Sequence, residues 1–235
     1  MKMPSRTEAL WKRSWRACFL FAWICLLVPS AQASTTETPT QEETEPEYGL
    51  DNVSREVSPK GRVQCPKVPM VRYEGKILRY RRPIRVYTGF QERLEKFEAL
   101  VREVAIEVYG RAPKTIVHMG TYNCRRIKGY PNLVSEHGMG NGIDIAGFNF
   151  GRLGKDEVLP EGLPRRLRRG FKVRLLDHWD GKKGANKVHA RFLRTLARRL
   201  IDGEEIFRVI LGPSFPGHKN HFHLDCAPYT MIDVF

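Results

Sequence analysis

Apolar residues recur at intervals of three and four in two parts of the chain, which predicts two long amphipathic helices. The first extends from Phe90 to Tyr109 and is ended by Gly110; the second begins at Asn186 or Lys187 and is ended by Gly203. Arginines occupy the outward positions of the second helix, so its other face is free to join a core. The inward positions are Leu94, Phe97, Val101, Val104, Ala105 and Val108 in the first helix, and Phe192, Leu193, Leu196, Ala197 and Leu200 in the second.

Shorter runs rich in β-branched and aromatic residues predict the strands of a sheet. The segment from Val68 to Tyr87 predicts one or two short edge strands, because it contains Pro69 and Pro83. Residues 178–181 are interpreted as a strand end and a turn. Two helices and several short strands in mixed order indicate an α+β domain with a small, mainly antiparallel sheet and two main helices. The other predicted strands are Thr115–Met119, Ile143–Phe148, Phe171–Leu176 and Ile206–Leu211.

The composition changes twice near the N-terminus, which predicts three regions. Residues 1–33 have a basic start, an apolar run and the small-residue pattern Ala31-Gln32-Ala33, as expected of a cleaved signal peptide. The apolar run has roughly 12 residues, short of the ~20 that a membrane span needs. Residues 34–57 are rich in Thr, Glu and Pro and are interpreted as a disordered linker. Residues 58–235 remain as one domain, long enough to bury a core.

The net charge of +14 favours a polyanionic partner, which means nucleic acid, anionic lipid or a cell-wall polymer. Secretion across the inner membrane, to the periplasm or beyond, argues against nucleic acid as the partner. No second apolar run follows the leader, so we expect no stable membrane span after cleavage. We therefore expect the partner to be peptidoglycan or another anionic cell-wall polymer. Three cysteines follow the leader, namely Cys65, Cys124 and Cys226, which predicts one disulfide and one remaining thiol. All three pairings are open at this stage.

Two stretches carry the candidate chemistry. Residues 135–144 contain His137 and Asp144, separated by three glycines, and both side chains suit a borderline cation such as zinc. Asp144 lies among apolar residues, where a bare carboxylate is costly unless it is paired or bound to a metal. Residues 217–225 add His218, His221 and His223, and the last two share one face of a strand. The two stretches are expected to converge on one ion, whereas His118 is interpreted as a structural histidine.

Together these stretches resemble those of known zinc peptidases. The pattern Ser135-x-His137-x-x-Gly140-x-Gly142-x-Asp144, followed by His218-x-x-His221-x-His223, is similar to D-alanyl-D-alanine carboxypeptidases, lysostaphin-type enzymes and murein endopeptidases. More closely, the chain resembles the bacterial extensin-like C-terminal domain family. This second resemblance rests on Tyr122-x-Cys124-Arg125, Ser135-Glu136-His137, Gly140-Asn141, Leu211-Gly212-Pro213 and His221-Phe222-His223-Leu224-Asp225. It implies a core of the type shared by these peptidases (LAS enzymes) and hedgehog domains.

The resemblance also implies roles for individual residues. The zinc ligands would be His137, Asp144 and His223, with water as the fourth, as in an open catalytic site. His221 would be the general base, because no Glu or Asp lies between Glu205 and His223.

The remaining implied roles concern the substrate. His218 would either orient His221 or hold the leaving amine, and Arg125 would stabilise the oxyanion, with Arg126 as the weaker choice. Ser135 would bind substrate or support His137. The chain departs from the family at Gly142, where alanine is common, and in having few cysteines, so the family's disulfide pattern does not transfer.

The expected function is a secreted zinc peptidase that cleaves peptide bonds of peptidoglycan, as either an endopeptidase or a carboxypeptidase. The main alternative is a non-catalytic zinc-containing module that binds the cell envelope. A secreted metal-dependent nuclease is disfavoured, because the paired carboxylates of two-metal phosphodiester chemistry are missing from the pattern.

Overall fold

The computed structural model describes residues 48–203 and 205–235. The predicted signal peptide and residues 34–47 of the predicted linker lie outside this part of the chain. The strands are β1 (Met70–Tyr73), β2 (Ile84–Tyr87), β3 (Thr115–Gly120), β4 (Arg126–Ile127), β5 (Tyr130–Val134), β6 (Gly142–Phe150), β7 (Phe171–Arg174), β8 (Val209–Leu211), β9 (Phe222–Asp225) and β10 (Met231–Asp233). The helices are α1 (Phe90–Tyr109), α2 (Leu175–His178) and α3 (Gly184–Asp202), with 3-10 turns η1 (Glu136–Met139) and η2 (Arg165–Arg168).

A six-stranded sheet is built around β6. Its strand order is β10-β8-β9-β6-β3, and β7 also pairs with β6. The first half of β6 pairs with β9 and the second half with β7, both antiparallel. The β10–β8 pair is parallel. The predicted α+β class with a mainly antiparallel sheet is therefore confirmed.

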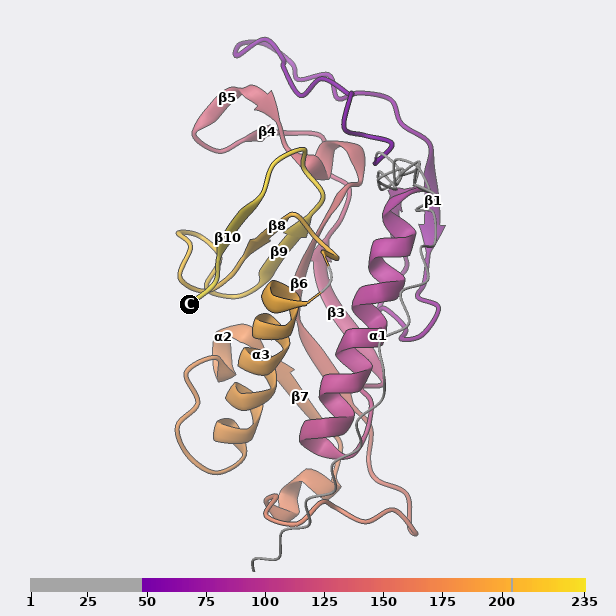
Figure 1. Ribbon diagram of the computed structural model, residues 1–235, viewed down its shortest axis with the longest axis vertical. Coiled ribbons are helices and arrows are strands. Elements are labelled where there is room, and N and C mark those ends of the chain that lie inside the picture. The colour runs from indigo at the N-terminus through magenta and orange to yellow at the C-terminus, as the bar shows by residue number, and fades with distance from the viewer. Residues whose placement is uncertain (1–47, 204) are drawn as a thin grey trace, which may run out of the picture. The chain divides into compact units, whose positions relative to one another are not determined.

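Helices α1 and α3 cover one face of this sheet (Figure 1). Ile143, Ile145, Phe148 and Phe150 of β6 point into the resulting core and are at most 4% exposed. Phe192 of α3 meets Phe148 edge-on, with ring centroids 5.2 Å apart. We call this the covered face and the other side of the sheet the open face.

A bulge in β6 keeps the apolar side chains of both halves of this strand on the covered face. Ile145 and Phe148 both belong to the core although they are three residues apart, and the pairing with β3 shifts register beside them. Gly147 lies at this point with φ 152°, and a Cβ there would come within 2.0 Å of the Val173 carbonyl oxygen. The shift places Asn149 on the open face, like Asp144.

The two predicted long helices are confirmed. Helix α1 has the predicted bounds, and α3 begins two to three residues earlier than predicted, at Gly184. The predicted strands between Val68 and Tyr87 are β1 and β2, which pair only with each other. The interpretation of residues 171–176 as a strand and of residues 178–181 as a strand end and a turn was wrong in part, because residues 175–178 form α2. The β4–β5 hairpin before His137 and strand β10 were not predicted.

The folded domain begins before the predicted boundary at Ser58. Residues 48–57, assigned by composition to the disordered linker, pack on the domain, and Leu50 is only 2% exposed. Asp51 forms an ion pair with Arg208, and Arg55 forms one with Glu136. Composition did not predict this packing, because only a few apolar and charged residues of the segment make the contacts and their partners are far away in the sequence.

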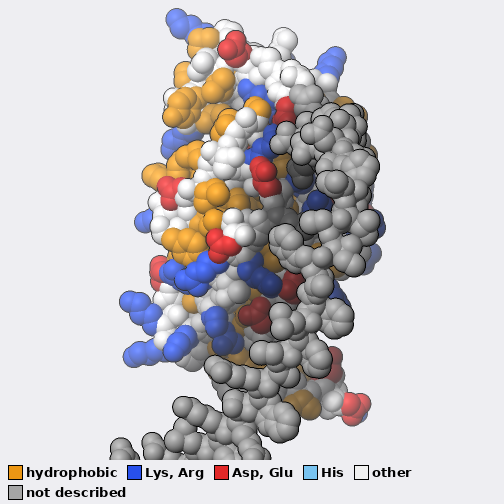
Figure 2. All heavy atoms as spheres, in the orientation of Figure 1, with side chains coloured by type: hydrophobic (Ala, Val, Ile, Leu, Met, Phe, Trp, Pro, Cys, Tyr) orange, Lys and Arg blue, Asp and Glu red, His pale blue; other side chains and the backbone are white. Residues whose placement is uncertain are grey.

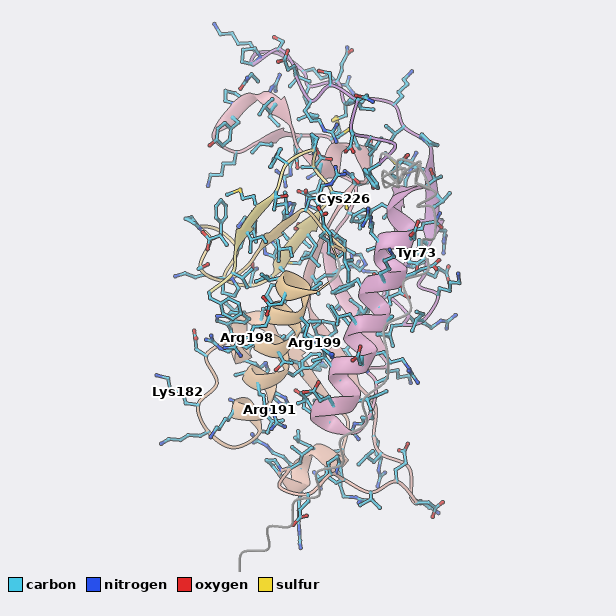
Figure 3. The ribbon with its side chains drawn as sticks, viewed as in Figure 1. Tyr73, Lys182, Arg191, Arg198, Arg199 and Cys226 are labelled. Carbon is cyan, nitrogen blue, oxygen red and sulfur yellow. A yellow bond between two sulfur atoms is a disulfide. The ribbon has the colours of Figure 1, made fainter. Side chains whose placement is uncertain are left out.

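A buried carboxylate fastens α1 to the β1–β2 connection. Glu98 is fully buried and accepts hydrogen bonds from the Tyr73 hydroxyl and from the backbone N–H groups of Lys76, Ile77 and Leu78. Tyr73 lies beside α1 in Figure 3. Four donors to one carboxylate offset the cost of burying its charge.

The three cysteines form the predicted one disulfide, between Cys65 and Cys124, and one free thiol. The free Cys226 is buried, which raises the pKa of its thiol to about 12 and keeps it unreactive. Lysine and arginine side chains are spread over the face of the molecule that bears α3 (Figure 2). No helix in residues 48–203 or 205–235 is long and apolar enough to cross a membrane.

Candidate metal centre

Three elements bring the candidate ligands together on the open face. Asp144 on β6 lies directly opposite His223 on β9 in the antiparallel register, so both side chains point to the same side. His137 lies in η1, just before β6, and Gly140 ends this turn with φ 64°. A Cβ at Gly140 would come within about 3.0 Å of the Tyr87 backbone nitrogen, so glycine suits both the conformation and the space.

The three side chains meet at short distances. His137 Nε2 lies 3.2 Å from Asp144 Oδ1 and 3.1 Å from His223 Nδ1, and the latter two atoms are 3.0 Å apart. Among the described residues, these three form the group of potential ligands close enough to share an ion. The convergence expected from the sequence is thus present in the geometry.

Hydrogen bonds on the outer side of each imidazole fix its tautomer. His137 Nδ1 lies 2.7 Å from the Thr121 carbonyl oxygen, which can only accept, so Nδ1 carries the proton. His223 Nε2 likewise donates to Asp225 Oδ2 at 2.7 Å. In the neutral imidazoles, both inner nitrogens therefore present lone pairs to the carboxylate of Asp144. Three acceptors at about 3 Å repel one another unless a cation or a proton lies between them.

The pKa values reflect this crowding. Burial raises the pKa of Asp144, but the hydrogen bonds and charges of His137 and His223 outweigh it and hold the pKa far below its usual value. For His223, burial lowers the pKa, while hydrogen bonds to Asp144 and Asp225 raise it to about 9 overall. A cation that binds here therefore competes with a proton for His223.

The arrangement fits zinc. Zn–N bonds of 2.0–2.1 Å in a tetrahedron place neighbouring ligand atoms about 3.3 Å apart, close to the separations found here. Two nitrogens and one carboxylate oxygen are ligands that zinc accepts, and three protein ligands leave a position for water. The outer carboxylate of Asp225 is the kind of partner that orients a metal-binding histidine.

His221 lies beside the ligands but outside their triangle. Its Nδ1 is 2.8 Å from Asn220 Oδ1, and its Nε2 is 3.5 Å from Asp144 Oδ1. With Nδ1–H donating to Asn220, the Nε2 lone pair points toward the centre. Burial lowers the pKa of His221, although Asp144 opposes this, so the imidazole is neutral at pH 7 and able to accept a proton. The His218 ring lies next to it at a tilt of 38°, with ring centroids 4.8 Å apart.

The three candidate substrate residues, Arg125, Arg126 and Ser135, differ in whether their side chains are free to contact a substrate. Arg125 is exposed, and its charge contributes, after burial, to lowering the pKa of His218. Arg126 instead donates to the carbonyl oxygens of Ser58, Lys60 and Gly61, so the structure gives its guanidinium a role in holding that loop. Ser135 is buried, and its carbonyl accepts from Gly138 N–H in the turn that carries His137. Of the two roles considered for Ser135, support of His137 is the one that these contacts favour.

Distant segments hold the His137 turn in place. Glu136 is buried, pairs with Arg55 at 2.8 Å and accepts from the side chain of Asn141. Tyr48 donates to Asn141 at 2.6 Å. On the other side, the Asn123 N–H donates to the His137 carbonyl at 2.9 Å, next to the disulfide at Cys124.

Sequence reasoning missed two parts of this arrangement. Asp225 follows His223 by two residues on a predicted strand, and this spacing alone places both side chains on one face. The Arg55–Glu136 pair joins residues 81 positions apart, and the pattern contains no signal for it. His118, interpreted as structural, has its Nε2 at 3.2 Å from the Arg82 carbonyl oxygen.

No curated protein and no solved structure matches the chain. The family model described as the extensin-like protein C-terminus matches residues 42–162, more than half of the 235 residues. The match includes His137 and Asp144 and stops before the stretch that contains His223. On this match, the chain belongs to the extensin-like protein C-terminus family.

Proposed function

We propose that this domain is a zinc-dependent peptidase that hydrolyses peptide bonds of peptidoglycan. The observation that carries the proposal is the centre itself: His137 Nε2, Asp144 Oδ1 and His223 Nδ1 lie 3.0–3.2 Å apart, and both imidazoles donate outward, to the Thr121 carbonyl and to Asp225. Such a site favours a divalent cation, and three protein ligands are typical of catalytic rather than structural zinc.

The chain's own residues supply the remaining parts of a hydrolase. When bound, zinc lowers the pKa of a coordinated water toward ~7 and polarises the scissile carbonyl. His221 Nε2, kept neutral by burial, accepts the proton of the attacking water and passes it to the leaving amine. Asn220 holds His221 in the required tautomer through its contact with Nδ1. Arg125 donates to the developing oxyanion, a contact of the kind worth about 3–4 kcal/mol.

The fold supports a relation to the LAS zinc peptidases, which we include in the proposal. His137 precedes the central strand β6, and Asp144 lies near the start of this strand. His223 lies on the antiparallel neighbour β9, so the three residues follow the order of the motif that those enzymes share. Export to the periplasm or cell exterior is part of the same proposal. The Cys65–Cys124 disulfide supports it, because disulfides persist mainly in oxidising compartments.

The test is digestion of isolated peptidoglycan sacculi by the purified, zinc-loaded protein, with the soluble products separated by mass. We expect wild type to release muropeptide fragments, and expect release to stop with a chelator or with His223→Ala. Lys219→Ala, an exposed neighbour, is the matched control and should behave like wild type. Equal products from wild type and His223→Ala would end the enzyme proposal, and binding of sacculi without release would favour the non-catalytic envelope module.

A further inference from the structure

A group of basic side chains lies on the open face at the end of β6 that is distant from the metal centre. We call Arg79, Arg81, Lys172 and Arg174 the distal basic cluster. None of the four forms an ion pair with a carboxylate of the described residues, in contrast to Arg55, Arg194, Arg199 and Arg208. The Arg174 guanidinium also donates to the carbonyl oxygens of Phe148 and Val173, so Arg79, Arg81 and Lys172 are the members whose side chains are available to a ligand.

The register of β7 places two members of the cluster. Lys172 lies opposite Asn149, which the bulge in β6 turns to the open face. Arg174 follows two residues later and donates from Nη2 to Asn149 Oδ1 at 2.7 Å, which holds its guanidinium on the same face. Lys172 is exposed and free to reach a ligand.

The segment beside β3 places the other two members. The Ile116 N–H donates to the Arg79 carbonyl, and the Arg81 N–H donates to the Ile116 carbonyl, so residues 79–81 extend the sheet at this edge. Tyr80 between them points into the core and is 5% exposed. Alternation along an extended segment therefore turns Arg79 and Arg81, both exposed, to the open face.

The cluster crowds like charges together. Burial lowers the pKa of Arg174 most, and the nearby charge of Arg81 lowers it further, while Asp177 opposes this only weakly. An anion bound between the two arginines relieves this repulsion. An arginine guanidinium can form two parallel hydrogen bonds to one carboxylate, which makes the contact specific in its orientation.

The strand between the two sites gives their spacing. From Asp144 to Asn149, β6 advances five residues, one of which is the extra residue of the bulge, so the two ends lie about 13 Å apart at the usual rise of a strand. We propose that the open face binds the substrate as an extended peptide, with a carboxylate about four residues from the scissile bond held by the distal basic cluster. This inference rests on the proposed peptidase function and adds a requirement on the substrate: an acidic group at that distance.

The spacing is testable with peptide hydroxamates, whose hydroxamate group binds zinc. Two series of alanine peptides (ladders) are used, one with the hydroxamate at the C-terminal end and one with it at the N-terminal end. In each ladder, a single glutamate is placed two to eight residues from the hydroxamate. Affinity for the zinc-loaded protein is measured by calorimetry. In one ladder it should peak near four residues, about three- to tenfold above the all-alanine peptide. A flat profile in both ladders would overturn the proposal.

Two double variants carrying the same change of charge identify the residues. Arg81→Gln with Lys172→Gln should remove the peak without changing the affinity of the all-alanine hydroxamate. Arg191→Gln with Lys187→Gln alters two exposed cations of α3, on the other side of the sheet, and should leave the peak intact. Loss of the peak in both double variants would show a general charge effect and contradict a local site.

A second measurement separates this inference from the metal proposal. Binding of a glutamate homopolymer to metal-free protein requires no zinc, and Arg81→Gln with Lys172→Gln should weaken it at least threefold more than the α3 pair does. If the all-alanine hydroxamate fails to bind wild type, the metal-site proposal fails, while the polymer comparison still decides the cluster. Equal losses in the two double variants would reject the cluster.

Discussion

The two faces of the central sheet are made from the same strands and differ in almost every physical property. On the covered face, Ile145 and Phe148 of β6 are fully buried under α1 and α3. On the open face, the neighbouring Asp144 joins two imidazoles at about 3 Å. Because side chains alternate along a strand, the packed Ile145 and the candidate ligand Asp144 point to opposite faces although they are adjacent in the sequence. The packed face holds β6 in place, and this fixes the position of Asp144, a candidate metal ligand, on its other side.

Histidines show the same contrast. His189 of α3 is buried on the covered side and contacts the Tyr109 hydroxyl through Nδ1 at 2.8 Å. Burial, followed by the charges of His178 and Arg166, lowers its pKa to about 4. His223, between two carboxylates, has its pKa raised to about 9. One environment excludes a positive charge and the other attracts one, which is the property that a cation site needs.

The largest expected effect on the open face concerns the proposed base. His221→Ala should reduce turnover of peptidoglycan about 100- to 10,000-fold, because proton transfer loses its acceptor. The variant should still bind one zinc, since His221 Nε2 lies outside the ligand triangle. Loss of zinc in this variant, measured by metal analysis after dialysis, would make His221 a ligand instead.

On the covered face, Phe148→Ala should lower the free energy of unfolding by about 3–5 kcal/mol, because it leaves a cavity against Phe192. Lys172→Ala, an exposed change on a neighbouring strand, should stay within about 0.5 kcal/mol of wild type. Denaturant unfolding of the metal-free proteins measures both values. Similar losses in the two variants would contradict the division between the faces.

A smaller effect is expected at Asp225, on the outer side of His223. Asp225→Asn retains the size of the side chain but removes the charge that orients His223, and should weaken zinc binding about 10- to 100-fold. Asp180→Asn, which alters an exposed carboxylate paired with Arg194, serves as the control. Competition with a chelating dye measures both affinities, and unchanged affinity in Asp225→Asn would show that His223 needs no such partner.

The smallest effect is a dependence of stability on pH that originates on the covered side. The pKa of His189 is about 4 in the folded protein and near 6.5 when unfolded, so the unfolded state binds the extra proton between these values. Lowering the pH from 7 to 5 should therefore cost about 2 kcal/mol of stability through this group. His189→Gln should reduce that loss, measured by urea unfolding of metal-free protein at both pH values. An unchanged loss would show that His189 titrates normally.

Much of the covered face could be predicted from the sequence, because periodic apolar residues determine local structure directly. The bounds of α1 and the inward residues of α3 follow from spacing alone. Asp144 and His223 could also be predicted as candidate ligands, since each lies in a short sequence motif with histidine at a fixed spacing. Their direct pairing on neighbouring strands, however, depends on the strand register, which the sequence does not state.

The parts that escaped prediction depend on contacts between distant residues. Residues 48–57 look like linker because their anchors are few, and Arg55 is held by a glutamate 81 positions away. The commitment of Arg126 to three loop carbonyls is equally invisible in its motif. The bulge at Gly147, which turns Asn149 to the open face, is marked in the sequence only by one glycine.

The central claim is that His137, Asp144 and His223 form one zinc site on the open face. Titration of zinc into metal-free protein by calorimetry tests it most directly, with Asp144→Ala and the exposed Asp180→Ala compared side by side. We predict one zinc per chain for wild type and Asp180→Ala, release of protons on binding, and an affinity at least about 100-fold weaker for Asp144→Ala. Equal binding by all three proteins, or no binding by wild type, would contradict the account.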